Sequence, residues 1–213
     1  MFGSVLSDSA QTALALLGES GLVAKAYLAG GSALALHFGH RYSLDFDFFT
    51  PDSFDPLKLS KKLQRIGKFE ETLAKGISLI GMFQSVKFSY FQYEYPLIFP
   101  TTKFLEVNLA NPKDIAAMKL VAIMDRGTKR DFIDLYELTK QGISLEKMFD
   151  YYEKKYHRLE ANLFALIKSL QYFDDAEGAE MPQMINKISW EEVKDFFVQE
   201  AMRLAHKYLG KTP

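Results

Sequence analysis

Residues 27–50 read YLAGGSALALHFGHRYSLDFDFFT, and this stretch decides the fold. A short apolar run leads into a Gly-Gly-Ser turn at residues 30–32, and a brief segment with helical character follows. The stretch ends in LDFDFF, residues 44–49, where two acids alternate with apolar residues. Because side chains two apart in a β-strand point to the same face, we expect Asp45 and Asp47 to share one face while their neighbours enter a core.

The two carboxylates and the glycine turn each suit one part of a metal–triphosphate complex. Neighbouring carboxylates repel each other beside an apolar core unless a cation lies between them, and Mg²⁺ is a hard ion that takes oxygen ligands. Gly30, Gly31 and Ser32 open a helix, so their backbone N–H groups and the positive end of the helix dipole suit a phosphate. The pattern predicts that Asp45 and Asp47 bind Mg²⁺, or Mn²⁺ in its place, beside a nucleoside triphosphate.

Each feature alone is common, since a glycine pair is usually a tight turn and D-x-D usually lies on a solvated strand face. In this order and spacing they resemble the polymerase-β-like nucleotidyltransferase signature, in which such a turn opens a helix and D-x-D lies on the next strand. The longer string GGSALALHFGHRYSLDFDFF, residues 30–49, resembles the AbiEii/AbiGii toxin branch of that superfamily. The resemblance implies an α/β (α+β) fold: a mixed sheet with flanking helices, followed by a helical C-terminal half.

A second informative stretch lies in the C-terminal half. On a continuous helix Lys119 and Arg126 would share a face with Arg130, and Asp131 and Asp134 would share one as well. A run of charges is most often a solvated, salt-bridged face. The AbiEii-like family, however, has a K-x-x-A-x-x-x-R segment followed by R-D-x-x-D-L, and this chain matches both. The resemblance implies that Lys119 contacts the triphosphate and that the R-D-x-x-D element completes the site.

One position departs from the pattern of polymerase-β-like enzymes, which usually have a third carboxylate on a later strand. The strand expected at residues 86–93 has Ser89 at that position, and a serine is neither an anionic metal ligand nor a general base. Glu94 and Glu106 are nearby acids, and Glu106, expected on a strand at residues 104–109, is a candidate substitute. Without the third acid we expect slower transfer more than weaker binding, because that acid helps to deprotonate the attacking hydroxyl.

The expected site residues fall into two groups. The expected catalytic residues are Asp45, Asp47, Lys119 and Asp131, of which Asp45 and Asp47 are the metal ligands. The expected nucleotide-binding residues are Gly30, Gly31, Ser32, Arg41, Lys119, Arg126, Arg130 and Asp134. Arg41 is included because a guanidinium so near the turn can reach a phosphate oxygen. His37 and His40 are not expected to form a metal-binding pair, because Gly39 is expected to end the helix between them.

Composition bounds the class of protein. The chain has 213 residues, 48% hydrophobic and 25% charged, which is typical of a globular protein with a real core. A net charge of −1 means that the protein as a whole does not attract nucleic acid electrostatically. It does not exclude a basic groove on part of the surface. The absence of cysteine excludes disulfides, thiol catalysis and cysteine–zinc sites. No run has the length of a membrane span and no signal peptide is recognised, so we expect a cytoplasmic protein and no membrane partner.

Apolar periodicity and capping residues predict the elements. Helices are expected at residues 8–17, 33–38, 56–66, 114–124, 129–139, 145–156, 159–170 and 190–209, and strands at 24–29, 44–49, 69–74, 77–83, 86–93 and 104–109. Residues 174–183 are expected to be a loop, and Ser189 and Glu192 to form a capping box. We expect residues 1–111 to be a nucleotidyltransferase core and residues 112–213 a helical half that completes the cleft, as two domains or one compact unit.

Three interpretations follow. The leading one is a Mg²⁺-dependent nucleotidyltransferase that transfers a nucleoside monophosphate from a nucleoside triphosphate to an RNA such as tRNA, or to a protein. The resemblance implies the toxin part of a toxin–antitoxin or phage-defence pair, with a cognate antitoxin as partner. The alternative is a nucleotide-binding or partner-binding module of the same fold, catalytically impaired by Ser89. The third is a purely structural α/β protein in which Asp45 and Asp47 point away from the glycine turn.

Overall fold

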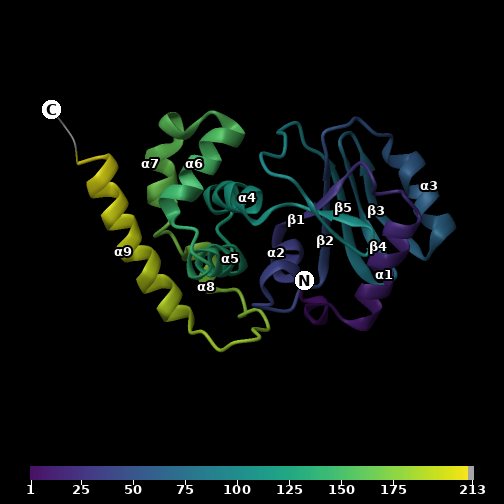
Figure 1. The fold of residues 1–213 in the computed structure, drawn as a ribbon, viewed down its shortest axis with the longest axis horizontal. Coiled ribbons are helices and arrows are strands. Elements are labelled where there is room, and N and C mark those ends of the chain that lie inside the picture. The colour runs from purple at the N-terminus through teal and green to yellow at the C-terminus, as the bar shows by residue number, and fades with distance from the viewer. Residues whose placement is uncertain (211–213) are drawn as a thin grey trace. The chain divides into compact units, whose positions relative to one another are not determined.

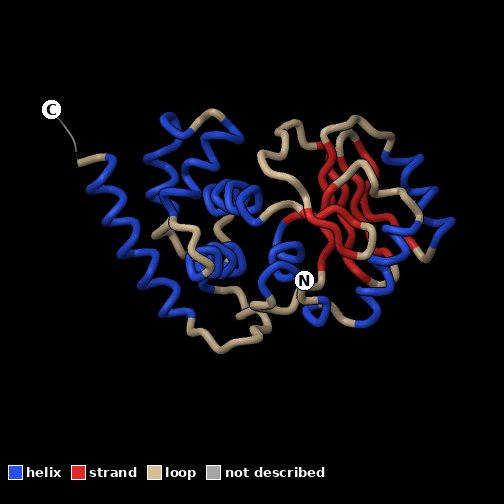
Figure 2. Tube along the Cα trace, in the orientation of Figure 1, coloured by secondary structure: helices blue, strands red, loops and turns tan. Residues whose placement is uncertain are grey.

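The computed structural model of the chain describes residues 1–210, which are arranged in two compact units. The first unit is Met1–Asn111 and the second is Pro112–Pro213. A seven-stranded sheet lies in the first unit, and the described part of the second consists mainly of helices (Figures 1 and 2). Among residues 1–210, none of the helices combines the length and apolar character that a membrane crossing needs.

The sheet of the first unit is mixed. Its strands are β1 (Tyr27–Ala29), β2 (Asp45–Thr50), β3 (Phe69–Lys75), β4 (Ser78–Phe83), β5 (Val86–Gln92), β6 (Thr102–Phe104) and β7 (Val107–Leu109). They lie in the order β3-β4-β5-β2-β1-β7-β6. β2 runs antiparallel to β1 and parallel to β5, and β1 runs parallel to β7. This mixed sheet with flanking helices confirms the expected fold class.

The helices of the first unit flank the sheet. They are the 3₁₀ helix η1 (Gly3–Val5) and the α-helices α1 (Asp8–Glu19), α2 (Gly30–Phe38) and α3 (Pro56–Ile66). Figure 1 shows α1 and α3 on one side of the sheet and α2 on the other. Side-chain caps start α1 and α3: Ser7 Oγ accepts the Ala10 N–H, and Asp55 accepts the Lys58 N–H ahead of Pro56.

The second unit is built from helices with amphipathic faces. They are α4 (Pro112–Asp125), α5 (Lys129–Lys140), α6 (Leu145–Tyr156), α7 (Leu159–Ser169), α8 (Asp174–Glu177) and α9 (Trp190–Tyr208). Fully buried Phe132 of α5 packs against Phe197 of α9 with ring centroids 5.3 Å apart. Aromatic rings of this size bury large apolar areas, so this contact joins α5 and α9 into one core.

Two expectations about the chain's elements are wrong. The strand expected at residues 104–109 is a hairpin of β6 and β7, because Leu105 and Glu106 adopt φ values of 49° and 59° and reverse the chain. Positive φ at residues other than glycine is uncommon, so the sequence carried no turn signal there. The loop expected at residues 174–183 contains the short helix α8.

The predicted capping box of α9 forms only in part. Ser189 Oγ accepts the Glu192 N–H at 3.0 Å, as expected. The carboxylate of Glu192 instead accepts the Tyr136 hydroxyl at 2.7 Å, which ties α5 to the start of α9. Burial raises the pKa of Tyr136 to about 12, and the hydrogen bond to Glu192 adds to the shift, so Tyr136 remains a donor at neutral pH.

Candidate active site

β2 presents its two acids on one face of the sheet. Asp45 and Asp47 are partly exposed, whereas Phe46 and Phe48 between and after them are fully buried. Phe48 packs on Phe88 of the neighbouring strand with ring centroids 5.6 Å apart, so one face of β2 belongs to the core. The period of two residues that the sequence predicted is therefore the observed arrangement.

The carboxylate of Asp47 faces the glycine turn. Gly30 has a φ of +65°, and a Cβ built on it would lie 3.3 Å from Asp47 Oδ2. The turn and the acid are thus in close approach: the positive φ favours glycine, and any side chain at residue 30 would have to displace the Asp47 carboxylate slightly. The purely structural interpretation expected the acids to point away from the turn, and Asp47 points toward it.

α2 begins directly at this turn. Its N-cap is Ala29, and within the described residues no side chain caps this end. The N–H groups of a first helical turn have no partner inside the helix and carry the positive end of its dipole. The start of α2 beside Asp47 therefore has the properties of a phosphate-binding turn.

The hydroxyl of Ser32 has a positioning role in this arrangement. It donates to the backbone carbonyl of Asp45 and lies 2.7 Å from the hydroxyl of Ser43. Ser32 is only 3% exposed. These bonds tie the first turn of α2 to the start of β2, so the group that Ser32 can offer a phosphate is its backbone N–H.

Ser89 occupies the position expected for a third acid. In the parallel pairing of β2 with β5, Ser89 lies opposite Asp47 and Lys87 lies opposite Asp45. Directly opposed residues share a face, so Ser89 and Lys87 both join the face of the acids. Ser89 is 4% exposed, whereas Lys87 is exposed. Lys87 was not identified as a site residue from the sequence. Its position two residues before Ser89 on the same strand would have placed it on the face of the acids.

Glu106 does not replace the missing acid. It lies in the turn between β6 and β7 rather than on a strand, and its carboxylate is 3.1 Å from Lys103 Nζ. The sheet order places β1 and β7 between β2 and this hairpin's outer strand β6. The suggestion that Glu106 supplies the third carboxylate is therefore wrong.

The donors on β2 fit a magnesium ion that is completed by substrate. Among residues 1–210 no group of three acids, histidines or cysteines is arranged to hold a metal. Mg²⁺ is usually bound by one or two carboxylates together with substrate phosphates, and Asp45 and Asp47 supply two on one face. His37 does not contribute, because its ring Nε2 is hydrogen-bonded to the Ala110 carbonyl at 2.9 Å and Gly39 ends α2 after it.

The second constellation is a buried ionic cluster inside the second unit. Lys119 Nζ lies 2.8 Å from Asp131 Oδ1 and 2.6 Å from Asp134 Oδ2. All three side chains are at most 8% exposed. Arg126 Nε reaches Asp131 Oδ2 at 3.2 Å, and Thr128 donates to the same oxygen at 2.6 Å.

The reason for this proximity differs from the expectation. Lys119 and Arg126 would share a face only on a continuous helix; as the predicted helices at 114–124 and 129–139 imply, α4 ends at Asp125, and Gly127, with a φ of +45°, separates it from α5. Packing of α4 against α5 brings Lys119 to the acids. Arg130 is exposed on α5, and Arg41 is 3% exposed and donates to the Tyr42 carbonyl.

The charges in this cluster determine the protonation of Asp131. Burial alone would raise its pKa, but the charges of Lys119 and Arg126 and the hydrogen bonds from Lys119 and Thr128 outweigh burial and lower the pKa to about 2. Asp131 is consequently ionised at neutral pH. A carboxylate with so low a pKa holds a cation well and accepts a proton poorly.

Comparison with known families gives a match over nearly the whole chain. Residues 12–209 match the family model described as nucleotidyl transferase AbiEii toxin, type IV toxin–antitoxin system. A curated protein of Aquifex aeolicus, the uncharacterised aq_aa25, is 41% identical over 176 residues, which cover 80% of this chain and 84% of the relative.

Solved structures share the fold at low identity. JHP933 of Helicobacter pylori superposes with a TM-score of 0.56 at 19% identity, covering 97% of this chain and 95% of that one. MenT4, a nucleotidyltransferase toxin of Mycobacterium tuberculosis, superposes with a TM-score of 0.53 at 14% identity, covering 93% of this chain and 89% of that one. These likenesses bear on fold, and they agree with the mixed sheet described above.

Proposed function

The chain belongs to the AbiEii family of nucleotidyltransferase toxins of type IV toxin–antitoxin systems, and from that premise we propose that it transfers a nucleoside monophosphate from a nucleoside triphosphate to an RNA. The observation that carries the proposal is the close approach of Asp47 to Gly30 at the start of α2. It joins a carboxylate pair to a phosphate-binding turn, which are the two parts that a metal-bound triphosphate needs.

Each part of the site has an assigned role. Asp45 and Asp47 would hold Mg²⁺, which in such sites neutralises charge on the phosphates. The backbone N–H groups of Gly31 and Ser32 would bind the phosphates that leave as pyrophosphate. In the reaction an acceptor hydroxyl forms a bond to the α-phosphorus, the bond from that phosphorus to the bridging oxygen breaks, and the hydroxyl proton passes to a base or solvent.

Lys119 is assigned to the triphosphate as a positive charge. Its ammonium is held in one place by Asp131 and Asp134, at 2.8 and 2.6 Å. Because both partners are carboxylates and the lysine side chain is only 8% exposed, contact with the triphosphate would require Lys119 to exchange one of these partners for a phosphate oxygen. With a pKa of about 2, Asp131 suits this positioning role better than proton transfer.

RNA is favoured over a protein acceptor by a basic stripe on α3. Lys58, Lys61, Lys62 and Arg65 are all exposed, and their spacing of three, four and seven residues places them on one helix face. No acid lies within Pro56–Ile66, although Asp55 just before it pairs with Lys58 at 3.4 Å. Leu59 and Leu63 are buried, and α3 contacts β3 and β4. A stripe of cations on a chain of net charge −1 is a local attraction for a polyanion.

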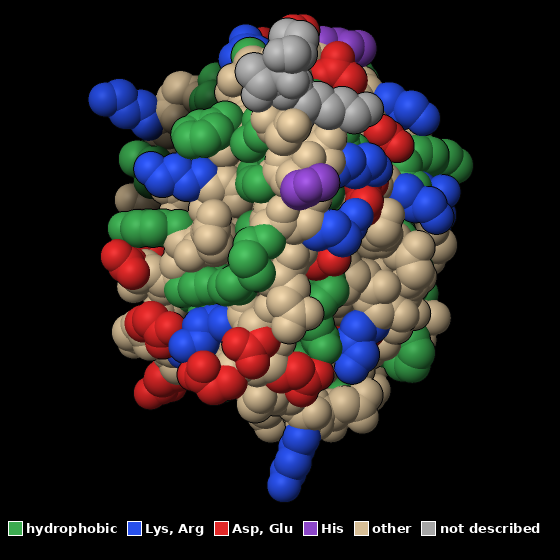
Figure 3. All heavy atoms as spheres, turned by 90° about the vertical axis from the view of Figure 1, so that its left-hand side faces the viewer, with side chains coloured by type: hydrophobic (Ala, Val, Ile, Leu, Met, Phe, Trp, Pro, Cys, Tyr) green, Lys and Arg blue, Asp and Glu red, His purple; other side chains and the backbone are tan. Residues whose placement is uncertain are grey.

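The face that carries α9 has a different distribution of charge (Figure 3). Figure 3 views the face that carries α9, where acidic and basic side chains are intermixed and hydrophobic ones are scattered among them. Arg203 of α9, for example, is paired with Glu146 and Glu200. The contrast supports α3 as a contact for the body of an RNA. The family match separately implies a cognate antitoxin protein as a further partner.

The second candidate is a nucleotide-binding module without transfer activity. Its specific support is the neutral Ser89 opposite Asp47, where a third carboxylate would help to deprotonate the acceptor. This candidate predicts nucleotide binding at the same acids with no labelled product.

A transfer assay tests the proposal. Each of the four nucleoside triphosphates, labelled at the α-phosphate, is incubated with the protein, Mg²⁺ or Mn²⁺, and either bulk tRNA or cell protein. We expect label in RNA, abolished by Asp47→Asn and retained in Asp52→Asn, a nearby exposed acid paired with Lys25 at 3.6 Å. Absence of label from every combination would contradict the enzyme proposal, and label in protein alone would contradict the choice of acceptor.

A further inference from the structure

A row of aromatic rings lies beside the row of acids on the same sheet face. In the strand register, Ala29 of β1 and Ser89 of β5 lie opposite Asp47 of β2. Two residues further along β2, Tyr27 and Phe91 lie opposite Phe49. The Tyr27 and Phe49 ring centroids are 6.0 Å apart and stacked, and those of Phe49 and Phe91 are 5.7 Å apart. Two residues of a strand span about 7 Å, so the row of rings begins about 7 Å along the strand from Asp47.

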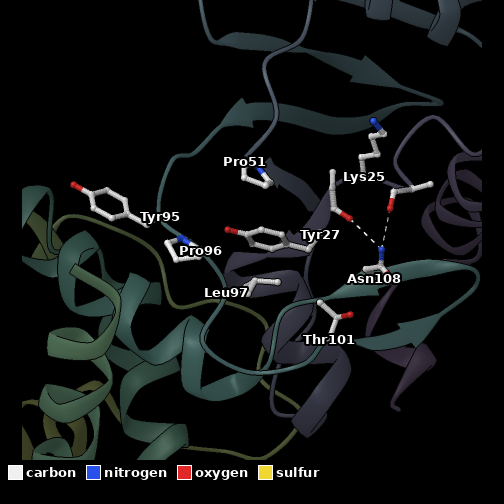
Figure 4. Close-up of a pocket in the computed structure, with 10 residues that line it drawn as sticks. Lys25, Tyr27, Pro51, Tyr95, Pro96, Leu97, Thr101 and Asn108 are labelled. Carbon is white, nitrogen blue, oxygen red and sulfur yellow. Dashed lines mark hydrogen bonds between the residues drawn. The ribbon is translucent and has the colours of Figure 1, made fainter. Parts of the chain in front are cut away.

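A pocket opens at the Tyr27 end of this row. Its volume is about 310 Å³. Figure 4 shows the Tyr27 ring between Pro51 and Leu97, with Pro96 beside it and Tyr95 farther out at the edge of the lining. These walls come from the end of β2, the start of β1 and the segment after β5, so three parts of the first unit build the pocket.

One polar side chain in the lining is fixed. The Asn108 amide nitrogen lies 3.2 Å from the Ala24 carbonyl and 3.4 Å from the Ala26 carbonyl. Because both amide hydrogens have backbone acceptors, the orientation of the Asn108 amide is set, and its oxygen remains an acceptor. Thr101 adds a hydroxyl to the lining.

The chemistry of the lining excludes a phosphate as the preferred ligand. Its charged member is Lys25, whose side chain is 83% exposed and paired with Asp52. Pockets of about 300 Å³ or more with apolar and aromatic walls and a few fixed polar groups are typical sites for small organic ligands. Nucleobases stack on such rings and are read by fixed polar groups at their edges.

We propose that this pocket binds a nucleobase, and that it is a base subsite of the proposed nucleotidyl-transfer site. Nucleobase binding by the pocket does not depend on the proposed function, whereas the role of the pocket as a subsite of the transfer site rests on it. The base belongs either to the nucleoside triphosphate or to the end of the RNA acceptor, since both bring a base within about 7–14 Å of the phosphates at Asp47, two to four strand residues away.

Nucleosides without phosphate test the pocket by itself. The four ribonucleosides are titrated into the intact protein without metal, and binding is followed by protein NMR. Leu97→Trp fills the pocket and Tyr95→Leu removes an aromatic wall, while Leu57→Trp on the exposed face of α3 and Tyr172→Leu in the second unit are the matched controls.

We expect at least one nucleoside to bind, with affinity at least about fivefold weaker in Leu97→Trp and Tyr95→Leu, the lower end of a stacking contribution, and unchanged in both controls. No binding by the intact protein would overturn the proposal. Binding that neither pocket variant weakens would overturn it as well. If Leu97→Trp does not fold, Tyr95→Leu alone decides.

The transfer assay then identifies the source of the base. A raised KM for the triphosphate in Tyr95→Leu assigns the pocket to the donor, and a raised KM for RNA assigns it to the acceptor. Nucleoside binding without any transfer would contradict the proposed function and leave the pocket standing. Transfer with both KM values unchanged would contradict the base subsite and leave the proposed function standing.

Discussion

Asp47 and Ser89 lie directly opposite each other across the parallel pair of β2 and β5. The position is the one at which a third carboxylate would share a metal with Asp45 and Asp47. Ser89 is buried and has no acidic group, so the face carries two carboxyl groups rather than three. Introducing an acid at residue 89 tests whether a cation binds beside Asp47.

Ser89→Asp should make stability depend on Mg²⁺. A third carboxylate beside Asp47 is repelled when no cation is present, whereas Ser89→Asn has a similar shape without the charge. We expect the Asp variant to melt at least about 3 °C below the Asn variant in EDTA, roughly 1 kcal/mol for a chain of this length. The gap should close in Mg²⁺. A gap of equal size in both buffers would show that no cation binds beside Asp47.

Gly30→Ala should weaken nucleotide binding more than stability alone explains. The matched control is Gly21→Ala, because Gly21 has a φ of +70° against +65° for Gly30, and a Cβ there meets nothing within 4 Å. Both changes place alanine in the left-handed region, at about 1–2 kcal/mol each. Only the change at Gly30 crowds Asp47, so only it should weaken Mg²⁺-dependent triphosphate binding in calorimetry. Equal affinities of the two variants for the triphosphate would contradict the assignment of Gly30 to the nucleotide-binding site.

Asp131→Asn should flatten the acid limb of the stability curve. The pKa of Asp131 is about 2 in the folded protein, against 3.8 for an aspartate in the unfolded chain. The contribution of Asp131 to the free energy of unfolding is therefore complete above pH 3.8 and is lost as the pH falls through 2. The linkage amounts to about 2 kcal/mol, of which about half is lost by pH 3.

Urea unfolding between pH 6 and pH 3 measures this effect. The control is Asp150→Asn, an exposed acid on α6. We expect the fall in unfolding free energy to be smaller by about 1 kcal/mol in Asp131→Asn and unaltered in the control. Parallel curves for all three proteins would mean that Lys119 and Arg126 do not hold Asp131 ionised.

Removing the stripe on α3 should reduce the salt dependence of RNA binding. Each phosphate contact contributes about 0.7–0.9 to the slope of log affinity against log salt. Replacing Lys61, Lys62 and Arg65 by Gln should therefore lower the slope by about 2. The control removes three exposed lysines of the second unit, Lys147, Lys154 and Lys168, so that net charge changes equally. The prediction fails if both triple variants lose the same slope.

Local patterns predicted much of the first unit. α3 begins at Pro56 and ends at Ile66 as expected, because a capping acid, a proline and a strong apolar period coincide there. The alternation in β2 also placed Asp45 and Asp47 on one face correctly. Where one local rule dominates, the sequence suffices.

Other features depend on packing between distant residues. Leu105 and Glu106 form a turn although neither is a typical turn residue, because the hairpin of β6 and β7 requires it. Lys119 meets Asp131 through the packing of two helices, not along one helix face. The hydroxyl of Ser32 is bonded to the Asp45 carbonyl rather than left for a ligand, and no sequence pattern reports such a long-range bond.

The most direct measurement is calorimetric titration of the protein with each nucleoside triphosphate, with and without Mg²⁺. The same titration is repeated on Asp45→Asn, Asp47→Asn and the control Asp52→Asn. We predict binding that requires Mg²⁺, that is lost in the first two variants and that persists in the third. Failure of the intact protein to bind any triphosphate, or equal binding by Asp47→Asn, would contradict the assignment of Asp45 and Asp47 as the centre of a nucleotidyl-transfer site.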